Sequence, residues 1–159
     1  MAESIKKILV PIDGSENSYR AARLGADLAR KYGAELFVVH GLDLDRNLTY
    51  FGLFGVPFTE GTKQLVESAT REVEPWFERV RKEAAATGGG KEEAPLRMTT
   101  EVIEAPLSIV GEIVNYAEKN GIDLIVMGSR GRTGFKKLLL GSVASGVVSY
   151  AHCPVLVVK

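Results

Sequence analysis

Three glycines and a serine in this chain have the spacing of a phosphate-binding site. Gly128 and Gly131 follow the apolar run 122–127, and Gly141-Ser142 comes after nine further residues. The free backbone N–H groups at a helix N-terminus and the positive end of the helix dipole both favour anions. If a helix begins near Gly141, these segments form a phosphate site just beyond the carboxyl end of a buried strand.

The spacing differs from that of two better known phosphate-binding loops. A P-loop requires Lys and then Ser or Thr after its second glycine, whereas Arg132 and Thr133 follow Gly131. Gly128, Gly131 and Gly134 give Gly-x-x-Gly-x-x-Gly, and the dinucleotide fingerprint is Gly-x-Gly-x-x-Gly. Taken alone, the glycines are also compatible with a simple tight turn after a strand.

The elements that must position these residues follow from the apolar pattern. Short apolar runs alternate with segments of helical period, which predicts an α/β fold, a doubly wound, Rossmann-like five-stranded parallel sheet with helices on both faces. The strands are predicted at 5–12, 34–42, 96–104, 122–127 and 155–158, the third at a sheet edge. The helices are predicted at about 15–33, 62–86, 108–119 and 142–151, with Ser15 as an N-cap.

Length and composition favour a single domain over residues 1–159. The chain has 45% hydrophobic residues, and its 20 basic residues balance 20 acidic ones. A net charge of zero predicts no nucleic-acid partner and no anionic membrane partner, so any anion site must be local. No apolar stretch approaches the roughly 20 residues that span a bilayer. We therefore expect a cytoplasmic protein, and the single Cys153 fits a reducing compartment.

The pattern Gly-x-x-Gly, nine residues, Gly-Ser resembles the nucleotide-binding motif of the universal stress protein family. Residues 7–15, KILVPIDGS, and 153–158, CPVLVV, resemble the first and last strands of that family. The resemblance spans nearly the whole chain. It implies the strand order 3-2-1-4-5 and the ATP-binding subgroup that carries this motif.

The resemblance also implies where each part of a nucleotide lies. The site is expected between the first and fourth strands, where the strand order reverses. Asp13 has an alternative role as a helix cap. The residues expected to bind nucleotide are Pro11, Ile12 and Asp13 beside the adenosine, Gly41 at the purine, Met127 and Gly128 at the ribose, Arg130 and Gly131 at the phosphates, and Gly141, Ser142 and Val143 at the helix start.

Arg130 and Arg132 can add charge-assisted hydrogen bonds to phosphate oxygens. Arg130 is the arginine that we expect first to bind phosphate. Arg132, together with Lys136 and Lys137, also fits a solvated basic loop whose field favours a triphosphate.

Two positions depart from the family pattern. Gly41 follows the His of the second strand, where the family carries an aliphatic residue against the purine, so base selectivity is expected to loosen. At 105–107 the family's Gly-x-Pro is replaced. This departure is expected to affect the packing of the helix that follows and not the binding of phosphate.

These features predict an ATP-binding stress or signalling protein, with Mg²⁺ arriving on the triphosphate and at most slow hydrolysis. No catalytic set and no metal-ligand spacing is identified, and we expect His40 and His152 in core or surface roles. Cys153 is interpreted as a small buried residue, not a nucleophile.

Two rival functions remain open. One is an ATP-consuming enzyme of the related adenine-nucleotide hydrolase-like superfamily, although the Ser-Gly-Gly-x-Asp-Ser loop of the ATP pyrophosphatases is absent after the first strand. The other is a dimer that carries the motif but binds no ligand. Because the strand 155–158 is short, apolar and at a sheet edge, we expect a homodimer that pairs through it.

The segment 47–58 mixes aromatic residues with helix breakers and is interpreted as a mobile loop. Its aromatic residues have three alternative roles, which are to cover the nucleotide, to pack on a partner subunit or to close the core of the domain.

Overall fold

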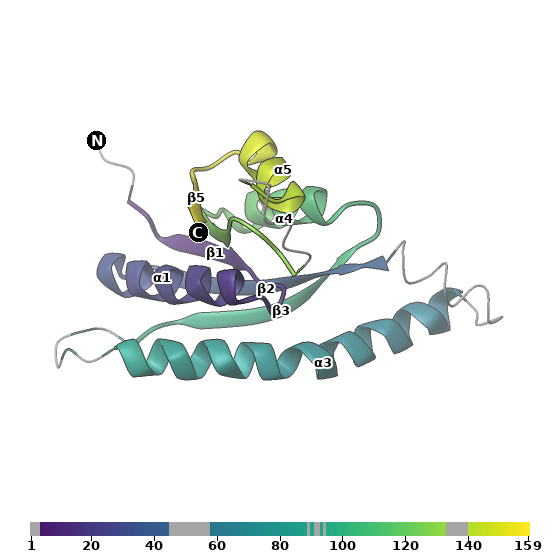
Figure 1. The fold of residues 1–159 in the computed structure, drawn as a ribbon, viewed down its shortest axis with the longest axis horizontal. Coiled ribbons are helices and arrows are strands. Elements are labelled where there is room, and N and C mark those ends of the chain that lie inside the picture. Colours follow the sequence, from purple (N-terminus) through teal and green to yellow (C-terminus); the bar gives the residue numbers. More distant parts are fainter. Residues whose placement is uncertain (1–3, 45–57, 89, 91–92, 94, 133–139) are drawn as a thin grey trace.

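A five-stranded parallel sheet lies between two layers of helices (Figure 1). The computed structural model describes residues 4–44, 58–88, 90, 93, 95–132 and 140–159. The strands are β1 (Lys7–Pro11), β2 (Glu35–Asp43), β3 (Met98–Ala105), β4 (Leu124–Gly128) and β5 (Val155–Val158). All pairs are parallel and the order is β3-β2-β1-β4-β5, which confirms the predicted fold class and strand order.

The helices are α1 (Glu16–Tyr32), α3 (Phe58–Thr87), α4 (Ile109–Asn120) and α5 (Ser142–Tyr150). Strand and helix bounds agree with the prediction to within two residues, except that α3 begins four residues earlier. The segment 47–57, to which three roles were assigned, lies outside the described residues. Within the described ranges, no helix is both long enough and apolar enough to cross a membrane.

The central strand β1 supplies side chains to both cores. Ile8 and Val10 pack with residues of α1 and α3, while Leu9 packs with residues of α4 and α5. All three side chains are fully buried. This alternation is the two-residue period of a strand, and burial on both faces explains why the strand reads as a continuous apolar run.

Ser15 and Gly33 define α1. The Ser15 hydroxyl accepts a hydrogen bond from the Ser18 N–H at 3.2 Å, which caps the first turn. Gly33 has φ 65°, a left-handed conformation that lets its N–H satisfy the last carbonyl groups of the helix. Both ends of α1 therefore lie where the sequence predicts them.

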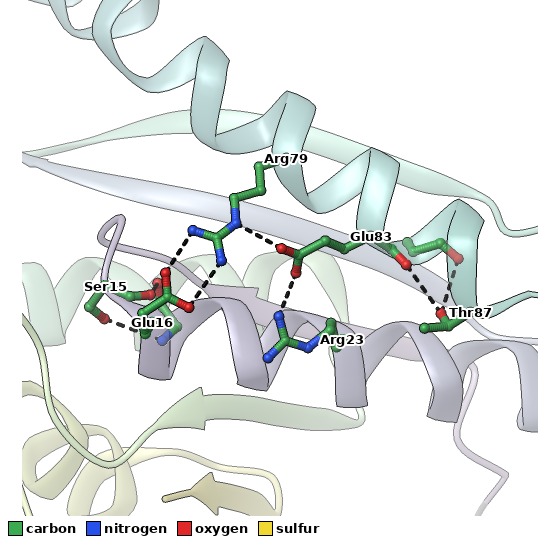
Figure 2. Close-up of polar contacts among 8 residues, drawn as sticks. Ser15, Glu16, Arg23, Arg79, Glu83 and Thr87 are labelled. Atoms are coloured by element: carbon green, nitrogen blue, oxygen red, sulfur yellow. Dashed lines mark hydrogen bonds and ion pairs between the residues drawn. The ribbon is translucent and has the colours of Figure 1, made fainter.

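The helices α1 and α3 are joined by a chain of ion pairs (Figure 2). Arg79 donates to both carboxylate oxygens of Glu16, at 2.8 and 3.0 Å, and to Glu83 at 2.7 Å. Arg23 donates to the other oxygen of Glu83 at 2.6 Å. The Arg79 guanidinium also lies 3.8 Å from the ring centroid of Tyr19. This network holds the C-terminal half of α3 against α1.

The helix α3 runs below the sheet along the length of the molecule and bends on its course (Figure 1). Pro75 lies inside it. A proline in a helix interior lacks the N–H for one backbone hydrogen bond and bends the helix. Trp76, directly after this proline, faces the carboxyl ends of the strands through the contacts described below.

Candidate functional site

The turn after β1 is held by hydrogen bonds of its own backbone and side chains. The Ile12 N–H donates to the Val39 carbonyl at 2.8 Å, which continues the ladder between β1 and β2. Gly14 follows with φ 79°, a conformation that a residue with a side chain adopts only with strain. The Asp13 carboxylate oxygen Oδ1 accepts from the Ser15 N–H at 3.0 Å. The turn is thus fixed before α1 begins.

Asp13 also binds the loop that follows β4. Its second carboxylate oxygen, Oδ2, accepts from the Arg132 N–H at 3.0 Å. The two residues are 119 positions apart in the chain, so this bond ties together the two strand-to-helix connections that meet at the reversal of strand order. Asp13 therefore combines a local turn with a long-range link, and its predicted alternative role as a cap belongs to Ser15.

The loop after β4 returns to the start of α5. The Ser129 N–H donates to the Val158 carbonyl at 2.7 Å, and the Ser129 carbonyl accepts from the Gly141 N–H at 2.6 Å. Gly141 is the N-cap of α5, and no side chain among the described residues caps this helix. The first-turn N–H groups of α5 therefore lie beside the glycine-rich loop, which is the arrangement that the spacing predicts.

A different neighbour leaves no room for a side chain at each of the three glycines of the motif. A Cβ on Gly131 would lie 2.7 Å from the Asp13 Oδ2 atom, and one on Gly141 would lie 3.3 Å from the Ser129 carbonyl oxygen. A Cβ on Gly128 would instead lie 3.0 Å from the backbone of Asn17 in α1. Gly141 thus permits the loop to close on itself, Gly131 permits the loop to approach Asp13 in the turn after β1, and Gly128 permits α1 to pack on the end of β4.

Gly41, the position of the departure from the family pattern, packs against α4. A Cβ there would lie 3.1 Å from the Cγ2 atom of Ile109. The aliphatic group beside this point of β2 is therefore supplied by the first residue of α4. The helix itself begins after the N-cap Ser108, as predicted, despite the changed sequence at 105–107.

Several predicted site residues present little side chain to a ligand. Ile12 and Met127 are buried in the two cores, with 3% and 5% of their surface exposed. Val143 packs partly into the core beneath α5. Pro11 is half-buried in register with Val39 of β2. These residues can contribute backbone atoms and shape to the site.

Ser142, Arg130 and Arg132 differ in exposure. Ser142 and Arg132 are exposed, and Arg130 is half-buried. Arg130 Cα would lie 3.5 Å from a Cβ on Gly141, so its backbone lines the closed loop. Arg132, the second choice from sequence, is the arginine whose backbone binds Asp13.

The sequence did not indicate two further residues that lie at the site, His40 and Trp76. The Nδ1 atom of His40 lies 2.9 Å from the Ile12 carbonyl oxygen, so it donates a hydrogen bond there. Trp76 meets the His40 ring edge to face, with centroids 5.1 Å apart. His40 was expected in a core or surface role; it lies on β2 with a half-buried ring that reaches the Ile12 carbonyl, just after the end of β1. A signal for Trp76 existed only in its being the one tryptophan of the chain.

Cys153 lies away from this site on the rim of the core beneath α4 and α5. Burial raises the pKa of its thiol above the ordinary value. A raised pKa leaves little thiolate at neutral pH, which agrees with the expectation that Cys153 is not a nucleophile, although the residue is half-buried and not buried as expected.

The universal stress protein family model matches residues 4–159. The chain belongs to this family. Universal stress protein MJ0531 of Methanocaldococcus jannaschii is 38% identical over 155 residues, covering 97% of this chain and 82% of that protein.

Solved structures agree with this family membership. The structure of MJ0577 from the same organism superposes with a TM-score of 0.75 at 31% identity, covering 99% of this chain and 97% of that one. A universal stress protein in complex with cAMP gives a TM-score of 0.66 at 20% identity, with coverage of 99% and 98%. The Archaeoglobus fulgidus universal stress protein in complex with dAMP gives 0.58 at 21% identity, with coverage of 99% and 100%. The last two similarities concern the fold, and the ligands belong to those proteins.

Proposed function

We propose that this universal stress protein binds ATP at the junction of β1 and β4 and acts as a nucleotide-dependent stress or signalling module. The observation that carries the proposal is the closure of the glycine-rich loop on the uncapped start of α5, through the 2.6 Å bond from the Gly141 N–H to the Ser129 carbonyl. The ligands of two structural neighbours, cAMP and dAMP, support an adenine nucleotide as the ligand class.

The phosphates would lie over the loop after β4 and the first turn of α5. The first-turn N–H groups of α5 and the helix dipole favour negative charge, and Ser142 adds an exposed hydroxyl. Arg130 and Arg132 provide two guanidinium groups on the same short segment. We place the phosphates at Arg130, Gly131, Arg132, Gly141, Ser142 and Val143, and the ribose at Met127 and Gly128.

The adenosine would lie toward the ends of β1 and β2. Pro11, Ile12 and Asp13 flank this end, and Gly41 leaves room that Ile109 partly fills. Since Ile109 comes from α4, the base would contact a residue that follows the third strand. A pocket lined this way is expected to accept more than one purine.

Magnesium would arrive with the triphosphate, where it neutralises phosphate charge. Hydrolysis requires a positioned water and a group that orients it. The carboxylate at hand, Asp13, is already bound by the N–H groups of Ser15 and Arg132, so we expect hydrolysis to be slow. The protein is proposed to act through its nucleotide-bound state, as a single cytoplasmic domain.

The first test is mass spectrometry of nucleotide released from purified, denatured protein. Calorimetry with Mg-ATP, ADP and AMP on the nucleotide-free protein follows. Copurified adenine nucleotide or a micromolar dissociation constant, equal to about 8 kcal/mol of binding free energy, is expected. The proposal would be rejected if no nucleotide copurifies and no binding is detected at millimolar ATP.

A homodimer through β5 is a second proposal, and a different observation favours it. β5 is an outer strand of the sheet. Leu156 on this strand, and Val148 and Tyr150 at the end of α5, are large apolar side chains exposed to solvent. An apolar edge strand offers unpaired backbone groups to a second copy across a two-fold axis.

Sedimentation equilibrium at micromolar concentration tests the dimer. The native chain is expected to sediment as a dimer and Leu156→Glu as a monomer. Leu107→Glu is the matched control, since Leu107 is 93% exposed and lies before α4. A monomeric native chain, or a dimeric Leu156→Glu variant, would count against pairing through β5.

A further inference from the structure

Trp76 lies where three segments of the site meet. A Cβ on Gly14 would lie 2.7 Å from the Cε2 atom of the indole, so the turn after β1 packs directly on the ring. His40 at the end of β2 meets the ring edge to face at 5.1 Å. The guanidinium carbon of Arg132 lies 5.3 Å from the ring centroid. The helix α3 thus contacts both strand-to-helix connections through one side chain.

Arg132 is held at this place by two contacts of different strength. Its backbone N–H is bound to Asp13, which fixes where the side chain starts. Its guanidinium contacts Trp76 as a cation against an aromatic ring, and the residue is exposed. An exposed cation–π contact is weaker than a charge-assisted bond to phosphate. A phosphate within reach therefore draws the guanidinium from the ring while the backbone stays in place.

We propose that Arg132 exchanges Trp76 for the distal phosphates of a bound nucleotide, so that α3 responds to the length of the phosphate chain. This inference rests on the proposed ATP site. Without nucleotide, the arginine covers one side of the indole and links the loop after β4 to α3. With a triphosphate, that link is lost and the indole becomes more accessible, whereas a monophosphate leaves the link intact.

Because Trp76 lies within α3, loss of its contact with Arg132 can change how α3 packs on the rest of the protein. On its C-terminal side, Arg79 and Glu83 hold the helix to α1. On its N-terminal side, Pro75 interrupts the backbone hydrogen bonds of the helix. Leu65 and Ala69 of the segment 60–74 pack with Leu42 and Leu44 in the smaller core cluster. Loss of the Arg132 contact therefore acts mainly on the half of α3 before Pro75.

Because the chain has one tryptophan, acrylamide quenching of its emission measures the exposure of Trp76 alone. In nucleotide-free protein, saturating Mg-ATP is expected to raise the Stern–Volmer constant roughly twofold, because the Arg132 guanidinium leaves one side of the indole, and AMP is expected to leave it unchanged. Arg132→Gln should show the raised constant without nucleotide, and Mg-ATP should raise it no further. Arg97→Gln, an exposed arginine outside the proposed site, is the matched control and should quench like the native protein with and without Mg-ATP.

Calorimetry on the same samples separates the two proposals. Heat of ATP binding with unchanged quenching overturns the exchange and leaves the ATP site standing. No heat with any nucleotide overturns both. An Arg132→Gln variant that quenches like the native nucleotide-free protein overturns the stacked state itself.

Hydrogen exchange then tests the link to α3. Peptides covering residues 60–74 are expected to exchange faster with Mg-ATP than with AMP, and those covering 76–87 equally in both. Equal protection of residues 60–74 in the two complexes overturns the effect on α3.

Discussion

The connections after β1 and β4 lie side by side, but they differ in how the N-terminus of the following helix is capped. At α1, the Ser15 hydroxyl caps the first turn by accepting from the Ser18 N–H, and Asp13 binds the Ser15 N–H. At α5, Gly141 stands at the N-cap position, and no side chain of the described residues caps the helix. Two neighbouring helix N-termini thus follow the carboxyl ends of β1 and β4, and within the described part of the chain a side chain caps only the first. The capped start contributes to the stability of the fold, and the start without a side-chain cap is where we propose the phosphate site.

Substitution of Gly131 by Val breaks the second connection and should have the largest effect. The new Cβ would lie 2.7 Å from Asp13 Oδ2, so the loop after β4 can no longer lie against Asp13, which binds the next residue, Arg132. ATP affinity is expected to fall at least about 100-fold, equal to about 2.7 kcal/mol. Calorimetry measures it, with Gly111→Ala as control, since a Cβ there meets only Ser108 at 3.5 Å. Unchanged affinity would refute the phosphate cradle.

Asp13→Asn separates the two connections from each other. The amide keeps one oxygen for the Ser15 N–H but presents an NH₂ group where the Arg132 N–H needs an acceptor. We expect a loss of about 1–2 kcal/mol in the free energy of unfolding, which is near the low end for a hydrogen bond to a charged group because this bond is exposed. Urea denaturation measures it.

Asp27→Asn is the control for this substitution, because Asp27 is exposed on α1 and its carboxylate makes only a 3.6 Å contact with Arg30. It is expected to change stability by less than about 0.5 kcal/mol. Equal losses in the two variants would show that the bond between Asp13 and Arg132 contributes nothing of its own.

The two serines at the helix starts sharpen the comparison. Ser15→Ala removes a cap and should cost about 1 kcal/mol of stability while leaving ATP affinity unchanged. Ser142→Ala removes no cap, so stability should change by less than about 0.5 kcal/mol, whereas ATP affinity should fall about 5- to 10-fold. Thermal unfolding and calorimetry on both variants measure the pair. The reverse pattern would assign the open helix start to α1.

Glu83→Gln leaves both connections intact and should have the smallest effect. Burial tends to raise the pKa of Glu83, but the hydrogen bonds from Arg79 and Arg23 outweigh it and lower the pKa below the ordinary value. A carboxyl group with a lowered pKa stabilises the fold above its unfolded pKa, and this contribution is lost as pH falls through the folded pKa. Because both arginines are about a third exposed, the variant should cost only about 0.5–1 kcal/mol at pH 7.

Urea titrations at pH 7 and pH 3 test this expectation. The difference between Glu83→Gln and the native chain should shrink between about pH 5 and pH 3. ATP affinity should not change. A difference that persists at pH 3 would mean that Glu83 acts through packing and not through its charge.

The fold and the glycine loop were predictable because each rests on a local signal. Apolar runs buried on both faces indicated the strands, and Ser15, Gly33 and Ser108 marked helix ends through their own backbone chemistry. The spacing of Gly131 and Gly141 indicated a loop that closes on a helix start. These signals depend on neighbours within a few residues, which a sequence shows directly.

The contacts of His40, Trp76 and Arg132 were not predictable for the opposite reason. They join β2, α3 and the loop after β4, and nothing in the spacing of these residues states that the elements meet. The ranking of Arg130 over Arg132 relied on similarity to a motif, whereas the bond of Arg132 to Asp13 depends on the register of two strands.

The central place of β1 has a consequence for how the chain acquires its structure during synthesis. One edge of β1 pairs with β2 soon after it is made, but the other pairs with β4, and the Lys7 N–H binds Asp123, 116 residues later. Until β4 leaves the ribosome, β1 keeps an apolar strand with one open edge, the kind of segment that associates with other chains. Early docking of α1 on β1 covers one face in that interval, and completion of the sheet must wait for most of the chain.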